Sequence, residues 1–205
     1  MTMRLIGMLD SPYVRRVAVS LHLMELPFAH EPLSVFGDFD AFAAINPVVK
    51  APSLVTEDGV VLMDSTLILD FAERLAPAAM RLTPVSLADH ARSQHLIGLA
   101  LAACEKVVQT VYEFRLRPEE KRHAPWLDRV GGQARAGFAA LEAEIGAREG
   151  WLFGPQPSQA DVTLAVVWSF AAGMRPELAD PALHPRLAGF AARAEGLPAF
   201  LAAAP

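Results

Sequence analysis

Short apolar runs alternate with helical periodicity over the first 76 residues of this 205-residue chain. Residues 3 to 9 fit a short buried strand, and residues 11 to 24 fit an amphipathic helix. The helix carries apolar residues at helical spacing, namely Val14, Val17, Ala18 and Leu21. A second strand is expected from Phe28 to Val35. A strand, a helix and a strand in this length match a right-handed βαβ unit, which predicts a partly parallel sheet.

The next segment adds two more strands and two more helices. Residues 38 to 45 predict a short helix that ends before Asn46-Pro47. The runs 53 to 55 and 60 to 63 flank Asp58-Gly59, a strong hairpin signal, so these strands are expected to be antiparallel neighbours. Asp64-Ser65 then begins a helix whose expected apolar face is Leu67, Ile68, Phe71, Ala72 and Leu75. The predicted order is β-α-β-α-β-β-α.

The β signal disappears after a stretch that contains Pro77 and Pro84. Helical spacing then follows Leu96, Leu99, Ala100, Ala103, Val107, Val111 and Phe114, in a long helix that ends near Arg117-Pro118. Further helices are expected over 126 to 148, from 158 onward, over 183 to 195 and over 197 to 203. The predicted fold class is therefore α/β plus all-α, with an α/β domain at 1–76, a linker at 77–86 and a helical domain at 87–205.

The helix that begins near residue 158 has a capping signature. Ser158 is followed three residues later by Asp161, which is the spacing of a capping box. Pro157 and Val162 stand where a hydrophobic staple would place them.

Composition excludes several classes of function. Eighteen basic residues against 23 acidic ones give a net charge of −5, and no basic stripe indicates nucleic-acid binding. Cys104 is the single cysteine, which excludes an intrachain disulfide and a CxxC pair, and its helical face predicts a small buried residue. The six histidines are scattered, so no metal site is expected. No apolar run predicts a signal peptide or a membrane span, and a cytoplasmic protein is expected.

Candidate chemistry gathers at one predicted edge of the sheet. Ser11 precedes Pro12 as a helix N-cap, at a helix end that suits an anion or a thiolate. Asp64-Ser65 begins another helix, and Pro52 begins a strand between the two. Each has a plain structural interpretation as well, since serines and acids cap many helices and a trans proline can start an edge strand. Together they lie where a βαβ-based sheet usually binds its ligand.

The chain resembles the glutathione S-transferases in their bacterial, serine-type form. In the first domain the resemblance rests on Ser11-Pro12-Tyr13-Val14-Arg15-Arg16-Val17, on residues 46–54 and on Asp64-Ser65. In the second it rests on residues 151–154, on Ser158-Gln159-Ala160-Asp161 and on residues 184–200. The implied fold is a thioredoxin-like N-terminal domain with a mixed four-stranded sheet, followed by a helical C-terminal domain.

The resemblance also implies an activity and a catalytic residue. Ser11 would donate a hydrogen bond to the sulfur of glutathione and keep it as the thiolate, which attacks a small hydrophobic electrophile. The role implied is detoxification, with glutathione as co-substrate and no metal. Because Ser11 replaces the cysteine of thiol-transfer relatives, a mixed disulfide at this position is chemically excluded.

Five further residues are expected to hold glutathione. The resemblance implies that Ala51 pairs its backbone with the cysteinyl unit through a cis Pro52. Ser65 would hold the γ-glutamyl carboxylate, and Asp64 would attract the α-amino group, although many relatives carry glutamate there and valine at Ala51. Lys50 would meet the glycine carboxylate, or else be a solvated surface lysine.

Other functions remain open at this point. A non-catalytic partner protein, like the stringent starvation proteins that share this fold and bind RNA polymerase, is one alternative. A glutathione-dependent isomerase, dehalogenase or lyase is another, although isomerase relatives carry Ser-Ser-Cys where this chain has Ser11-Pro12-Tyr13. Tyr112, Phe114 and Trp168 are given no role. The resemblance implies a homodimer, built from the third helix of the first domain and the long helix of the second.

Overall fold

The computed structural model describes residues 2–147 and 149–205 and divides into two compact units. The first unit comprises the chain up to Thr83 together with Gly196–Pro205, and the second is Pro84–Glu195. The sequence predicted a helical domain over 87–205, whereas in the structure the last ten residues of that range belong to the first unit.

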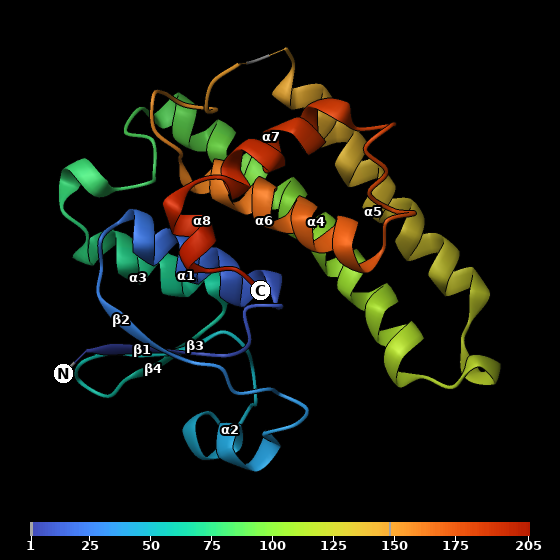
Figure 1. Ribbon diagram of the computed structural model, residues 1–205, viewed down its shortest axis with the longest axis horizontal. Coiled ribbons are helices and arrows are strands. Elements are labelled where there is room, and N and C mark those ends of the chain that lie inside the picture. Colours follow the sequence, from blue (N-terminus) through green and yellow to red (C-terminus); the bar gives the residue numbers. More distant parts are fainter. Residues whose placement is uncertain (1, 148) are drawn as a thin grey trace. The chain divides into compact units, whose positions relative to one another are not determined.

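The first unit is built on the mixed four-stranded sheet that the sequence predicted (Figure 1). Its strands are β1 (Met3–Ile6), β2 (Phe28–Glu31), β3 (Ser53–Val55) and β4 (Val61–Met63), in the order β2-β1-β3-β4. β1 and β2 are parallel, which confirms the βαβ unit, and β3 is antiparallel to both β1 and β4.

Three helices complete the expected element order. Figure 1 shows α1 (Pro12–Leu23) and α3 (Ser65–Leu75) on one side of the sheet and α2 (Phe39–Ile45) on the other. The four expected apolar residues of α1 are all buried. On α3 the buried stripe instead passes through Ile68, Leu69 and Ala72, while Leu67 and Leu75 are exposed. At 100° per residue Leu69 lies beside Ser65 on the inner face, whereas Leu67 faces away from it.

The C-terminal residues join the first unit through α1. Helix α8 (Pro198–Ala202) packs beside α1, and the Nε of Arg15 donates to the carbonyl of Ala203 at 2.9 Å. The Arg15 guanidinium also lies over the Phe200 ring, 5.6 Å from its centroid. A buried arginine needs such partners, and this requirement explains why residues 196–205 group with the α/β unit.

The second unit is helical. It contains α4 (Leu87–Leu116), the 3₁₀ turn η2 (Glu119–Lys121), α5 (Ala124–Ile145), α6 (Gln159–Met174) and α7 (Pro185–Glu195), while the turn η1 (Ala78–Met80) precedes it. The helix expected over 126–148 begins two residues earlier and ends at Ile145; its expected last residue, Arg148, lies outside the described residues. α4 packs along α5 and α6, and α6 packs on α7.

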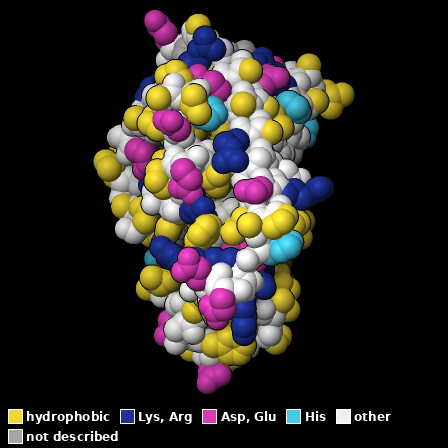
Figure 2. Space-filling view, turned by 90° about the vertical axis from the view of Figure 1, so that its right-hand side faces the viewer, with side chains coloured by type: hydrophobic (Ala, Val, Ile, Leu, Met, Phe, Trp, Pro, Cys, Tyr) yellow, Lys and Arg dark blue, Asp and Glu magenta, His cyan; other side chains and the backbone are white. Residues whose placement is uncertain are grey.

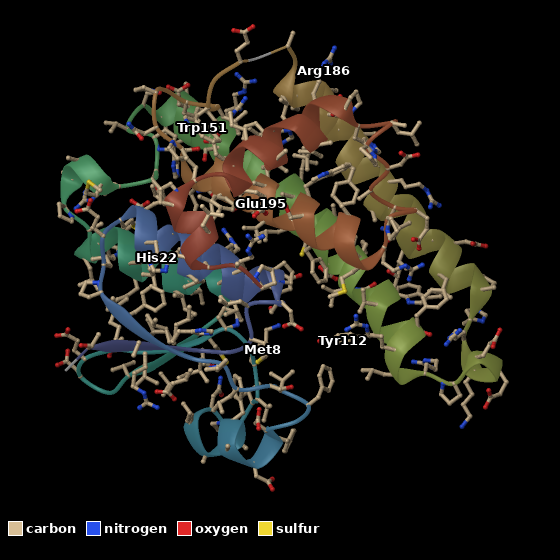
Figure 3. All side chains as sticks on the ribbon, in the orientation of Figure 1. Met8, His22, Tyr112, Trp151, Arg186 and Glu195 are labelled. Atoms are coloured by element: carbon tan, nitrogen blue, oxygen red, sulfur yellow. The ribbon has the colours of Figure 1, made fainter. Side chains whose placement is uncertain are left out.

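Several side chains of the second unit have structural roles. Cys104 is fully buried, as predicted. Trp168 is buried edge-on against Phe138, with ring centroids 5.5 Å apart, so it is a core residue. Trp151, labelled in Figure 3, packs against the ring of Phe190 and lies under the guanidinium of Arg193. This guanidinium also donates to two backbone carbonyls just before Trp151.

The predicted capping box of α6 is present and buried. The backbone N–H of Ser158 and its hydroxyl both donate to Asp161 Oδ2, and the N–H of Leu152 donates to Oδ1 at 2.8 Å. Burial raises the pKa of Asp161, and the hydrogen bonds from Ser158 and Leu152 oppose that rise. Asp161 therefore holds both the start of α6 and the turn at Leu152.

The surface mixes charges of both signs. Figure 2 shows acidic and basic side chains interspersed with hydrophobic ones over the face that it displays. Within the part of the chain that the structure describes, no helix has the length and apolar character needed to cross a membrane.

Candidate active site

Strand register places the predicted site residues at one edge of the sheet. Ile6 pairs with Ser53, and Ser53 pairs with Met63, so these three residues lie side by side across β1, β3 and β4. The chain leaves the sheet just beyond them, toward Ser11 after β1 and toward Asp64 after β4, and it enters β3 through Pro52. The convergence that the sequence predicted is therefore a consequence of the register.

Ser11 is the N-cap of α1, as predicted, and its hydroxyl is only weakly engaged. Its Oγ accepts from the N–H of Val14 at 3.5 Å, the outer limit of a hydrogen bond. This bond uses a lone pair and leaves the hydroxyl proton available for another acceptor. Ser11 is half-buried, and Met8, labelled in Figure 3, lies in the loop that joins β1 to α1 just before it.

Gly7 brings this loop against the segment that precedes β3. Its φ is +133°, and a Cβ added there would lie 2.7 Å from Val14 Cγ2 and 3.2 Å from the Cβ of Ala51. Only glycine fits both the backbone conformation and the space. The start of α1 and Ala51 are therefore in close approach.

The segment before β3 has the conformation that the family resemblance implied. The peptide bond between Ala51 and Pro52 is cis, and Pro52 is buried. Lys50 is exposed at the surface beside it. Asn46 organises this loop: it is buried, its Nδ2 donates to Ser53 Oγ at 2.8 Å, and its Oδ1 accepts from the N–H of Val48 at 3.0 Å.

The start of α3 presents two of the predicted residues. Asp64 is its exposed N-cap, and its Oδ1 accepts from the N–H of Thr66 at 2.8 Å. Its φ of +69° lies in the left-handed region, which non-glycine residues adopt at a cost of about 1–3 kcal/mol and most often at functional sites. Ser65 is the first helical residue and is buried.

Arg16 was not predicted as a site residue, yet its guanidinium contacts the first turn of α3. It is almost fully buried, and its Nη1 donates to Ser65 Oγ at 3.1 Å and to Thr66 Oγ1 at 3.3 Å. At 100° per residue Arg16 lies on the side of α1 opposite Val14, Val17 and Leu21, so the apolar pattern of the helix gave no signal for its burial. A charged side chain that is buried is expected to have hydrogen-bonding partners.

Comparison with protein families matches most of the chain. Residues 5–80 match the model of the glutathione S-transferase N-terminal domain, and residues 124–193 match that of the C-terminal domain. The chain belongs to the glutathione S-transferase family. The fold that the resemblance implied, a thioredoxin-like domain followed by a helical domain, is thereby confirmed.

Solved glutathione S-transferases cover the whole chain. A glutathione S-transferase of Methylobacterium radiotolerans, in complex with glutathione sulfonate, is 30% identical with a TM-score of 0.92, covering 100% of this chain and 95% of that one. A family member from Pseudomonas fluorescens Pf-5, with bound S-(propanoic acid)-glutathione, is 27% identical with a TM-score of 0.84, covering 100% of both chains.

A curated relative has a defined activity. Maleylacetoacetate isomerase of Pseudomonas aeruginosa is 29% identical over 156 residues, which cover 73% of this chain and 72% of the relative. Solved members of the family thus hold glutathione or a glutathione derivative.

Proposed function

We propose that this protein is a glutathione transferase, in which Ser11 stabilises the glutathione thiolate for attack on a small hydrophobic electrophile. The observation that carries the proposal is the convergence of three segments at one sheet edge: the Ser11 loop, the Ala51-Pro52 segment and the start of α3. They offer a hydroxyl, a backbone segment that ends in a cis proline, and a helix N-terminus. A tripeptide with a thiol and two terminal carboxylates needs groups of these kinds.

Each contact of the tripeptide has a candidate residue. The Ser11 hydroxyl can donate to the sulfur, and the backbone of Ala51 before Pro52 can pair with the cysteinyl unit. Ser65 and the first amides of α3 can bind the γ-glutamyl carboxylate, where the helix dipole favours negative charge.

Charged side chains would bind the two ends of glutathione. Asp64 keeps one carboxylate oxygen beyond its bond to Thr66, and this oxygen can accept from the α-amino group. Lys50 is exposed and can attract the glycine carboxylate as a point charge.

Retention on immobilised glutathione tests the binding step. We expect the protein to be retained and to elute with free glutathione. We also expect turnover of at least one compound in a screen of halonitrobenzenes, epoxides, isothiocyanates and hydroperoxides. Failure to bind would instead favour a non-catalytic partner protein with this fold.

The curated relative, a maleylacetoacetate isomerase, favours a second candidate activity, that of a glutathione-dependent isomerase. Isomerase relatives carry Ser-Ser-Cys in the loop where this chain has Ser11-Pro12-Tyr13. We therefore rank it below conjugation. Conversion of maleylacetoacetate without consumption of glutathione would reverse that order.

We also propose a homodimer built from α3 and α4, as the family resemblance implies. Leu67 on α3 and Leu87 on α4 are 65% and 82% exposed, and such apolar positions suit an interface. Light scattering at micromolar concentration should give twice the chain mass of 22.1 kDa. A monomeric mass contradicts the proposal.

A further inference from the structure

Arg16 is the largest fully buried side chain of the first unit, with 1% of its surface exposed. It lies on α1, five residues after Ser11, and its guanidinium points toward the start of α3. Burying a guanidinium is unfavourable unless hydrogen bonds compensate for the lost hydration. Two of those bonds go to the hydroxyls of Ser65 and Thr66, at 3.1 and 3.3 Å.

These bonds determine how the two hydroxyls can act. A hydroxyl has one proton and two lone pairs. Because Arg16 donates to each oxygen, each hydroxyl is left with its proton to donate to something else. Hydrogen bonds in a chain also polarise one another, so a hydroxyl that accepts from a guanidinium becomes a better donor.

The hydroxyls lie at the N-terminus of α3, where an anion is favoured on independent grounds. Asp64 adopts a left-handed backbone conformation there, and its carboxylate engages the N–H of Thr66. The helix begins at Ser65, so its first amides and the Ser65 hydroxyl belong to the same short stretch of chain. An acceptor placed at this end of α3 can therefore accept hydrogen bonds from the first amides of the helix and from the Ser65 hydroxyl.

We propose that Arg16 is a positioning residue for the α-amino carboxylate end of the ligand. It holds the Ser65 and Thr66 hydroxyls as donors and thereby raises the affinity of the α3 N-terminus for a γ-glutamyl carboxylate. This inference rests on the proposed function. It assigns to Arg16 a role in recognising one carboxylate, and none in the chemistry at sulfur.

A purely structural role makes a different prediction. If Arg16 only ties α1 to α3, its loss lowers stability and weakens every ligand of the site alike. If it positions carboxylate donors, its loss weakens ligands with the γ-glutamyl carboxylate and spares those without it. A pair of ligands that differ at this group separates the two roles.

The experiment compares glutathione with its analogue in which the γ-glutamyl α-carboxylate is a carboxamide. Calorimetry gives both dissociation constants for the wild type and for Arg16→Met. We expect the wild type to prefer glutathione by about 10- to 100-fold, in line with charge-assisted hydrogen bonds. We expect Arg16→Met to prefer it by less than about 3-fold. KM for glutathione should rise at least 10-fold with kcat changed by less than about 3-fold.

Arg15→Met is the matched control. Arg15 is the adjacent arginine, also buried, but its Nε donates to Ala203 and its guanidinium lies over Phe200. This variant should lose stability and keep the full preference for glutathione. Arg16→Lys should restore part of the preference, because an ammonium can reach a hydroxyl but lacks the planar fork.

Two further variants keep the proposal testable if Arg16→Met does not fold. Ser65→Ala and Thr66→Val remove the hydroxyls while Arg16 stays, and together they should reduce the preference below about 3-fold. A preference that survives in them, or in a folded Arg16→Met, overturns the inference. A wild type that binds both ligands equally also overturns it, whereas a wild type that binds neither overturns the proposed function itself.

Discussion

Ser11→Ala is expected to lower kcat/KM for glutathione conjugation by about 10- to 100-fold near pH 7. A free thiol has a pKa of about 8.5, so most glutathione is protonated at that pH. Lowering the pKa of the bound thiol by about 2 units requires about 2.7 kcal/mol of preferential binding of the thiolate. One hydroxyl bond at a helix N-terminus can supply energy of that order. Removal of the hydroxyl should therefore abolish most of this stabilisation of the thiolate.

The structure explains why this hydroxyl is free to act. Its bond to the N–H of Val14 is 3.5 Å long and uses only a lone pair. Loss of the cap should therefore cost about 1 kcal/mol of stability or less. The helix itself retains Pro12 at its first position and its buried apolar face. The expected loss of activity is thus chemical and does not result from unfolding.

The measurement is the thiolate absorbance of bound glutathione as a function of pH. The bound thiol should titrate about 1–2 units lower in the wild type than in Ser11→Ala, and in Ser11→Thr it should titrate near the wild type. Ser86→Ala is the matched control, because it removes an N-cap hydroxyl from α4, where the bond is 3.1 Å. That variant should lose stability without shifting the thiol pKa. Equal titration of the wild type and Ser11→Ala contradicts the role given to Ser11.

Local sequence patterns predicted most of the first unit. The Asp58-Gly59 pair predicted the hairpin of β3 and β4, and the spacing of apolar residues after Ser11 predicted α1. These features depend on residues close together in the chain. Once the strands pair, the position of Ser11, Pro52 and Ser65 at one edge follows from geometry. The site roles of these residues and of Lys50, Ala51 and Asp64 remain proposals.

Contacts between distant residues could not be predicted in the same way. Arg15 and Arg16 are neighbours in sequence, yet one contacts the C-terminal segment and the other the start of α3. No pattern within α1 distinguishes them. The same limit explains α8, which looks like a last helix of the second domain but packs on α1. It also explains why Leu67 is exposed. Its spacing on α3 fits an apolar helical face, but the sequence does not show that this side of the helix stays uncovered.

Asp161→Asn is expected to destabilise the second unit by about 3 kcal/mol. Asp161 is buried and accepts from two backbone N–H groups and one hydroxyl, distributed over both carboxylate oxygens. Asparagine offers one acceptor oxygen and a donor amide. The amide nitrogen must then face donors from either Leu152 or Ser158. A buried donor left without an acceptor costs about 1–3 kcal/mol, and more than one is affected here.

The pH dependence of this loss follows from the pKa shift. Burial raises the pKa of Asp161, so the folded state holds its proton more tightly than the unfolded state does. Such a group contributes most below its unfolded pKa of about 3.9, and the contribution declines as the pH rises through the folded value. The asparagine side chain of the variant does not titrate. The stability difference between wild type and Asp161→Asn should therefore be larger at acidic pH, although it persists at neutral pH because of the unpaired donors.

An exposed copy of the same capping motif provides the control. Ser86 and Asp89 at the start of α4 repeat the spacing of Ser158 and Asp161, with Asp89 donating its N–H to Ser86 Oγ at 3.1 Å. Because water can replace the lost contacts at this exposed end, Asp89→Asn should cost less than about 1 kcal/mol. Denaturant unfolding followed by Trp fluorescence measures both variants, because Trp151 and Trp168 lie in the second unit. Equal losses in the two variants would show that burial of the Asp161 carboxylate does not control the stability of this turn.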